Sequence, residues 1–125
     1  MATILVVDDD ENLRELLRLH LTGAGYDVEV AKDAIAAGYF LLRNRPDLIL
    51  CDVTMPHLDG FDFIAAVKAD PLLRNIPVIF LTSIKEGGAR GRELGAVGYL
   101  VKPVRADSLL ALVARHVPGG RTPIG

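Results

Sequence analysis

Five short apolar runs alternate with helix-like segments along the chain, and this alternation constrains the fold more than any other feature. The runs are rich in β-branched residues and cover residues 3–7, 26–31, 47–52, 76–83 and 97–101. Strands that alternate with helices predict right-handed crossovers and a parallel sheet with helices on both faces. The 125 residues therefore indicate one α/β domain, a sandwich of three layers.

The runs differ in their expected burial. Residues 47–52 and 76–83 are apolar almost throughout, which favours strands buried on both faces. Residues 26–31 alternate between apolar and charged side chains, so we expect a half-exposed strand at an edge of the sheet.

The helical segments differ in strength. The first has one leucine stripe, made of Leu13, Leu16, Leu17 and Leu21. Asp33 is suited to cap the second helix, whose larger apolar residues are Ile35, Tyr39, Leu41 and Leu42. Further helices are expected over residues 61–69 and 105–117. Residues 85–94 contain three glycines, each costing about 1 kcal/mol relative to alanine inside a helix, so we expect a short or frayed helix there.

Composition excludes several classes of protein. The net charge of −2 gives no general attraction to nucleic acid or to an anionic membrane, although the first half of the chain is acidic and the second half basic. The single cysteine, Cys51, excludes an internal disulfide and is compatible with a reducing compartment. We see no signal peptide and no apolar run near the ~20 residues of a membrane span. A soluble cytoplasmic protein is expected.

Charged and hydroxyl side chains follow the predicted strands where each strand ends. Asp8 and Asp9 follow the first strand, Asp52 ends the third, Thr82 ends the fourth and Lys102 follows the fifth. The carboxyl ends of parallel strands share one edge of the sheet, and ligands bind there. These side chains are therefore expected to converge on one site.

Three neighbouring carboxylates need a counter-charge or a shared proton. Oxygen ligands that leave positions open for water and phosphate suit Mg²⁺. The ion and Lys102 would then attract a phosphoryl group, Asp52 would be the nucleophile that receives it, and Thr82 would donate a hydrogen bond to its oxygens.

The acidic run also has simpler interpretations. Taken alone, Asp8 and Asp9 would be expected to cap the following helix, because acids favour helix N-termini. Their convergence with Asp52 and Lys102 favours the metal site instead. We expect Asp10 to shape the turn, and Cys51 to be a small buried hydrophobe.

Four motifs occur in an order that resembles the bacterial response-regulator receiver domain: VVDDDENLR, LILCDVTMPHLDG, VIFLTS and GYLVKP. The resemblance covers residues 3–117, which leaves 118–125 as a flexible tail or a linker stub. It implies a flavodoxin-like, doubly wound sheet of five parallel strands in the order 2-1-3-4-5, with five helices.

The resemblance also implies roles for residues in this sequence. Asp52 resembles the phosphoacceptor, and the expected Mg²⁺ or Mn²⁺ ligands are Asp8 through water, Asp9 and Asp52 directly, and the backbone carbonyl of Thr54. Lys102 is expected to pair with the phosphoryl group, ahead of a cis bond to Pro103. Thr82 and Tyr99 resemble a switch pair, in which the aromatic ring follows the threonine.

A receiver domain is a signalling phosphoacceptor and not an enzyme with an outside substrate; we expect only slow self-dephosphorylation. The implied partners are a sensor histidine kinase and an output partner or output domain. A homodimer would use the face formed by residues 85–94, 97–101 and 105–117. Direct contact with nucleic acid or a membrane is not expected. The glycines of residues 85–94 and Val104 depart from the family pattern on this face, so the usual dimer geometry stays open.

Two other classes remain as alternatives. A haloacid-dehalogenase-like phosphatase also uses aspartate and Mg²⁺, but its second aspartate is missing after Asp52, and turnover of a phosphomonoester would be needed to support it. A flavodoxin-like flavin carrier needs a phosphate-binding loop after the first strand, where this chain has acids. A yellow purified protein would support that class.

Overall fold

The computed structural model describes residues 2–83 and 88–117 and contains five strands and five helices in strict alternation. The strands are β1 (Thr3–Val7), β2 (Asp27–Ala31), β3 (Leu48–Asp52), β4 (Val78–Thr82) and β5 (Gly98–Val101). The helices are α1 (Glu11–Gly23), α2 (Ala34–Leu41), α3 (Gly60–Ala69), α4 (Gly88–Glu93) and α5 (Ala106–His116). The sequence predicts a domain over residues 1–117 and a tail over residues 118–125. Residue 1 and the tail lie outside the described residues, so this boundary stays a prediction.

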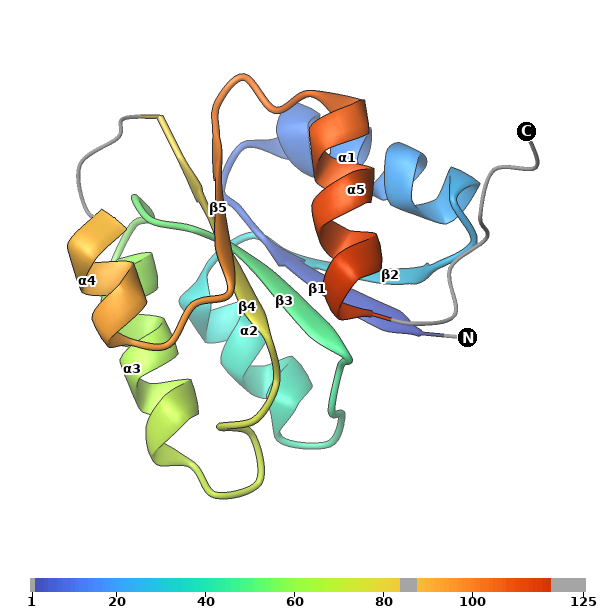
Figure 1. Cartoon of the computed structure of the whole chain (residues 1–125). Helices are drawn as coiled ribbons and strands as arrows, with labels where there is room; N and C mark the ends of the chain where they lie inside the picture. Colours follow the sequence, from blue (N-terminus) through green and yellow to red (C-terminus); the bar gives the residue numbers. More distant parts are fainter. Residues whose placement is uncertain (1, 84–87, 118–125) are drawn as a thin grey trace.

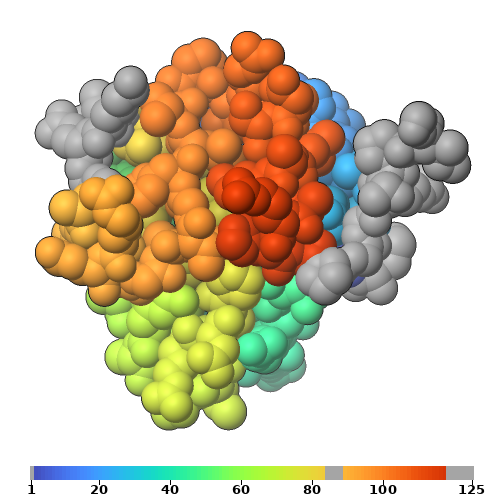
Figure 2. Space-filling model, in the orientation of Figure 1, coloured from blue at the N-terminus to red at the C-terminus, as the bar shows by residue number. Residues whose placement is uncertain are grey.

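All five strands are parallel and lie in the order β2-β1-β3-β4-β5, which confirms the predicted flavodoxin-like topology. Helices α1 and α5 cover one face of the sheet, and α2, α3 and α4 cover the other (Figure 1). The space-filling view shows α4, the β5 segment and α5 side by side on one surface (Figure 2). The edge position predicted for residues 26–31 is also confirmed.

Alternation along the central strands divides the core between the two faces. In β1, Ile4 and Val6 pack with α1 and α5, whereas Leu5 and Val7 pack with α2 and α3. Every residue of β3 and β4 is buried, as the continuous apolar runs predict. Cys51 belongs to this core and is buried, as expected.

In α1 and α2, the residues that face the core are not all the ones that the pattern of large apolar residues predicts. In α1, Leu17 and Leu21 are buried, but Leu16 of the predicted stripe is 45% exposed. In α2, the buried residues are Ala34 and Ala37. Phe40 and Leu41 are partly buried and pack against the same core. Three other large side chains expose more than half of their surface: Ile35, Tyr39 and Leu42. Small residues face the sheet, so part of the bulky apolar surface of α2 points outward.

Aspartate side chains start three of the helices. The Asp10 carboxylate accepts hydrogen bonds from the amides of Asn12 and Leu13, so it is the N-cap of α1. Asp33 caps α2 as predicted, and Asp59 caps α3. The acidic run after β1 therefore contains a cap, and that cap is Asp10, not Asp8 or Asp9.

Helix α4 has only six described residues, in line with the short helix expected from its glycines. Gly87, which contributed to that expectation, lies outside the described residues. Among the described residues, no helix is long and apolar enough to span a membrane.

Candidate functional site

The register of the sheet brings three carboxylates together. Strands β1 and β3 are neighbours with Val7 opposite Cys51, so the residues that follow, Asp8 and Asp52, emerge side by side. Oxygen atoms of Asp8, Asp9 and Asp52 all lie within 4.8 Å of one another. Asp8 and Asp52 are buried, whereas Asp9 is exposed. We call these three residues the acidic cluster.

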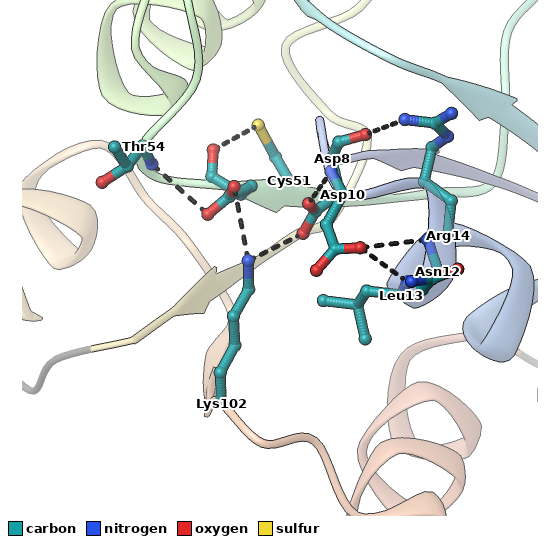
Figure 3. Close-up of polar contacts among 9 residues, drawn as sticks. Asp8, Asp10, Asn12, Leu13, Arg14, Cys51, Thr54 and Lys102 are labelled. Carbon is teal, nitrogen blue, oxygen red and sulfur yellow. Dashed lines mark hydrogen bonds and ion pairs between the residues drawn. The ribbon is translucent and has the colours of Figure 1, made fainter.

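Lys102 provides the nearest counter-charge. It follows β5, and its side chain reaches across the edge of the sheet, where Nζ lies 3.0 Å from Oδ2 of Asp8 and 3.4 Å from Oδ2 of Asp52 (Figure 3). Its amide donates to the carbonyl of Thr82 at 2.7 Å, which extends the pairing of β4 with β5. The peptide bond from Lys102 to Pro103 is cis. The convergence of strand ends predicted from the sequence is present for these residues.

The cluster carries more negative charge than one ammonium can balance. Burial raises the pKa of Asp52 to about 6, and the charge of Asp8 adds to this effect. Lys102 and the amide of Thr54, which donates to Asp52 Oδ1 at 3.3 Å, oppose the rise in the pKa of Asp52. Burial lowers the pKa of Lys102, but the close contact with Asp8 and the charges of Asp8 and Asp52 outweigh it, so this pKa is raised.

The two oxygens of Asp8 have different surroundings. Oδ1 accepts the amide of Asp10 at 2.9 Å. Among the described residues, Oδ2 is buried and accepts no hydrogen bond of ordinary geometry, so its contact with Lys102 is an ion pair. An oxygen-only cluster with an under-coordinated buried carboxylate oxygen fits a hard divalent cation such as Mg²⁺. Thr54 contacts the cluster through its amide; the role expected for its carbonyl stays a prediction.

Gly60 is a positioning residue that the sequence analysis did not identify. It is buried at the start of α3, and a Cβ there would lie 2.0 Å from the backbone oxygen of Asp52. Its amide donates to the carbonyl of Val53 at 2.7 Å, which folds the intervening loop back against β3. In the sequence, the pair Asp59-Gly60 is typical of a turn and a helix start, although glycine also indicates close backbone approach.

A second group of candidate residues lies between β4, β5 and α4. Phe80 and Tyr99 are partners in the register, with ring centroids 5.8 Å apart, and Phe61 of α3 meets Phe80 edge-on at 5.0 Å. A Cβ at Gly91 would lie 1.4 Å from the Tyr99 hydroxyl, so the ring occupies space that only glycine leaves. We call Phe61, Phe80, Gly91 and Tyr99 the aromatic corner.

The predicted switch residues Thr82 and Tyr99 both belong to this part of the sheet. Thr82 is buried two residues after Phe80, on the same face of β4. Burial raises the pKa of Tyr99, against smaller lowering effects from Arg92 and from the backbone of Gly91 and Arg92. Their motion on phosphorylation stays a prediction.

Exposed contacts connect α4 to α3. The guanidinium of Arg90 lies 3.4 Å from Oδ1 of Asp62, and both side chains are about half exposed. The same guanidinium lies over the ring of Phe61, 5.7 Å from its centroid. Such exposed pairs contribute about 0–1 kcal/mol each, so α4 is held to α3 only weakly.

The whole arrangement is that of a known family. The family described as "Response regulator receiver domain" matches residues 4–114. Response regulator PleD of Caulobacter vibrioides is 43% identical over 114 residues, which are 90% of this chain and 25% of PleD. Protein PilG of Pseudomonas aeruginosa is 35% identical over 118 residues, covering 92% of this chain and 87% of PilG.

Solved structures agree with this match. The chemotaxis response regulator CheY4 of Vibrio cholerae superimposes with a TM-score of 0.88 at 36% identity, covering 94% of this chain and 99% of CheY4. The chain spans only a quarter of PleD, so the activity of that whole protein does not transfer to it. The family match and the shared fold establish that the chain belongs to the response-regulator receiver domains of two-component signalling.

Proposed function

We propose that Asp52 accepts a phosphoryl group from a sensor histidine kinase in a reaction that requires Mg²⁺ or Mn²⁺, and that this controls an output partner. The observation that carries the proposal is the pairing of Asp52 with Asp8 and Lys102 at one edge of the sheet. A buried carboxylate held between a second carboxylate and an ammonium has little structural value, because burying charge destabilises the fold.

The acidic cluster and the backbone carbonyl of Thr54 are the groups that would hold the metal. When bound, the ion supplies positive charge that neutralises the carboxylates and binds phosphoryl oxygens. Asp8 is buried and accepts the Asp10 amide, which fixes its orientation before any ligand arrives. Arg14 donates to the carbonyl of Asp8 at 2.8 Å and steadies the same turn.

In the transfer step, a carboxylate oxygen of Asp52 attacks the phosphorus of a phosphohistidine. The new O–P bond forms as the N–P bond breaks, and the leaving imidazole nitrogen takes a proton. Asp52 must be ionised to attack, which its pKa of about 6 permits at neutral pH. The Lys102 ammonium, 3.4 Å from Asp52 Oδ2, is placed to pair with the incoming phosphoryl oxygens.

The same groups support a change of state. The hydroxyl of Thr82 would donate to the new phosphoryl oxygens, and Tyr99 would adjust in the aromatic corner. The surface formed by α4, β5 and α5 would then change its fit to an output partner, an output domain or a second protomer. Two exposed apolar residues of this surface, Val97 and Val101, support such a contact.

The domain would return to its first state by slow self-dephosphorylation. Water attacks the phosphorus, the O–P bond to Asp52 breaks, and inorganic phosphate leaves. A chain with this role needs no outside substrate, and it belongs in the cytoplasm, where the catalytic parts of histidine kinases act.

The test is incubation of the 125-residue protein with Mg²⁺ and acetyl phosphate, followed by intact-protein mass spectrometry. Wild type should gain one phosphoryl group that hydroxylamine removes, and Asp52→Asn should gain none. Asp10→Asn is the matched control, because it removes a neighbouring charge and keeps the helix cap. An unmodified wild type, or a modification that survives in Asp52→Asn, contradicts the proposal.

A further inference from the structure

Helix α2 presents an apolar stripe to solvent. Ile35, Tyr39 and Leu42 are 55%, 72% and 76% exposed, and their spacing of four and three residues puts them on one side of the helix. No charged residue occurs anywhere from residue 34 to residue 42. A surface helix normally carries charged or polar residues on its outer side. Three large side chains exposed together therefore indicate a surface that is covered in use.

The stripe is separate from the site and from the surface proposed for output. Helix α2 packs on the β1–β2 side of the sheet, whereas α4 lies against Phe80 and Tyr99 near the opposite edge (Figure 1). Helix α5 lies on the other face. A contact made by α2 could therefore form together with an output contact.

The charges at the two ends of α2 indicate what covers it. Lys32 and Asp33 stand at the start of the helix, where Asp33 is the cap, and Arg43 and Arg45 follow its end. In an antiparallel pair related by a two-fold axis near Tyr39, Ile35 of each copy meets Leu42 of the other. Asp33 of each copy then lies near Arg45 of the other. The two helix dipoles run antiparallel, which is favourable.

Asp33 and Arg45, the two residues that would meet in the dimer, are already held by hydrogen bonds within their own chain. Oδ1 of Asp33 accepts the amide of Ala36 at 2.8 Å, and Nε of Arg45 donates to the carbonyl of Leu72 at 3.2 Å. An uncharged stripe with Asp33 before it and Arg45 after it can pair these two residues across a two-fold axis, which favours a second copy over a purely basic or a purely acidic partner.

We propose that α2 is a homodimer interface, in which the stripe of Ile35, Tyr39 and Leu42 packs antiparallel against the same stripe of a second copy. An interface centred on one helix is smaller than the roughly 1,600 Å² of a stable complex, so the dimer is weak. Its dissociation constant should lie at about 0.1–1 mM for the separate chain.

Sedimentation velocity of the metal-free 125-residue protein, from about 10 µM to 1 mM, tests the proposal. Wild type should show a reversible monomer–dimer equilibrium. Tyr39→Glu and Leu42→Glu should raise the dissociation constant at least about tenfold, because Tyr39 lies at the two-fold axis and Leu42 meets Ile35 of the other copy. Arg45→Glu should raise it about threefold, because it places a carboxylate opposite Asp33.

Leu19 of α1 provides the matched control, since it is 55% exposed like Ile35 but lies on the other face of the sheet. Leu19→Glu should leave the dissociation constant unchanged, whereas Ile35→Glu should raise it. All four substituted side chains of α1 and α2 are exposed, so unfolding midpoints verify that each variant is folded. A protein that stays monomeric at 1 mM, a dimer insensitive to Tyr39→Glu, or an equal response to Leu19→Glu overturns the proposal.

Discussion

The acidic cluster and the aromatic corner are both built on the parallel sheet, but on opposite physical terms. The acidic cluster lies at the ends of the adjacent strands β1 and β3. Its buried carboxylates repel each other, and the ammonium of Lys102 lies between them. The aromatic corner grows from β4, β5 and two helices, and its rings are held by packing around a missing Cβ. Charge therefore decides how the acidic cluster is held, and packing decides how the aromatic corner is held.

The difference indicates where a ligand and a conformational change would each act. A cation or a phosphoryl group changes the charge balance of the acidic cluster. The aromatic corner responds to volume, because the Tyr99 hydroxyl already fills the space beside Gly91. Substitutions that change only charge, or only volume, should therefore separate the two regions.

The largest effect should come from Lys102→Met, which removes the counter-charge of two buried carboxylates. In chelator at neutral pH, the free energy of unfolding should fall by about 2–4 kcal/mol, because Asp8 and Asp52 are left buried without that partner. Urea denaturation measures the loss. Mg²⁺ should restore part of it, and Lys102→Arg should lose less than half as much. An equal loss in both variants would mean that packing, and not charge, holds the cluster.

Gly91→Ala tests the aromatic corner by volume alone. The new Cβ would lie 1.4 Å from the Tyr99 hydroxyl, so the ring must move, and we expect a net loss of about 1–3 kcal/mol despite the better helix propensity of alanine. In a Tyr99→Ala background the same change should be neutral or stabilising.

Gly38→Ala in α2 is the matched control for Gly91→Ala. A Cβ at Gly38 meets no atom within 4 Å, so this variant should gain about 0.5–1 kcal/mol in thermal or urea unfolding. If Gly91→Ala also stabilises the protein while Tyr99 is present, the packing described for the aromatic corner is wrong.

Asp52→Asn should stabilise the metal-free protein, whereas Lys102→Met and Gly91→Ala should destabilise it. Because folding raises the pKa of Asp52 to about 6 from an ordinary value near 3.8, the ionised carboxylate destabilises the fold above pH 6. This penalty disappears as the pH falls through 6 toward 4, where the folded state binds the proton first. The gain should be about 1–2 kcal/mol at pH 7.5 and small at pH 4.5. Urea denaturation at both pH values measures it, and a gain independent of pH contradicts the assignment.

The smallest expected effect is the difference in stability between alanine substitutions at Asp10 and at Asp9, two neighbours in the acidic run. Asp10→Ala removes the cap of α1 and should cost about 1 kcal/mol with or without metal. Asp9→Ala should leave the metal-free protein unchanged or slightly stabilised, and it should weaken Mg²⁺ binding measured by titration calorimetry. A clear loss of stability for Asp9→Ala in chelator would make Asp9 a structural residue.

The sequence was most informative where backbone pattern decides position. The five strands and the convergence of Asp8, Asp52 and Lys102 follow from alternation and from strand ends sharing one edge, whereas the strand order followed from the family resemblance. It was least informative where packing decides. Apolar character does not show that α2 turns Ala34 and Ala37 inward.

Two further features depended on geometry that the sequence pattern does not show. The capping role of Asp10 needed the backbone geometry of one turn. The proximity of Gly91 to Tyr99 needed the placement of α4 against β5, and nothing within α4 encodes it. Gly60 could have been identified, since a glycine that follows a site residue by a short loop often marks a close backbone approach.

The contacts of Arg90 with Asp62 and Phe61 have a consequence for the solution conditions in which the domain works. Both partners of the ion pair are exposed, and salt at physiological concentration screens charges over about 8 Å. The helix beside Tyr99 is therefore held to its neighbour by a contact that weakens as ionic strength rises. Because such a pair contributes only about 0–1 kcal/mol, salt should loosen the link between α3 and α4 slightly and leave the packing of Gly91 against Tyr99 unchanged.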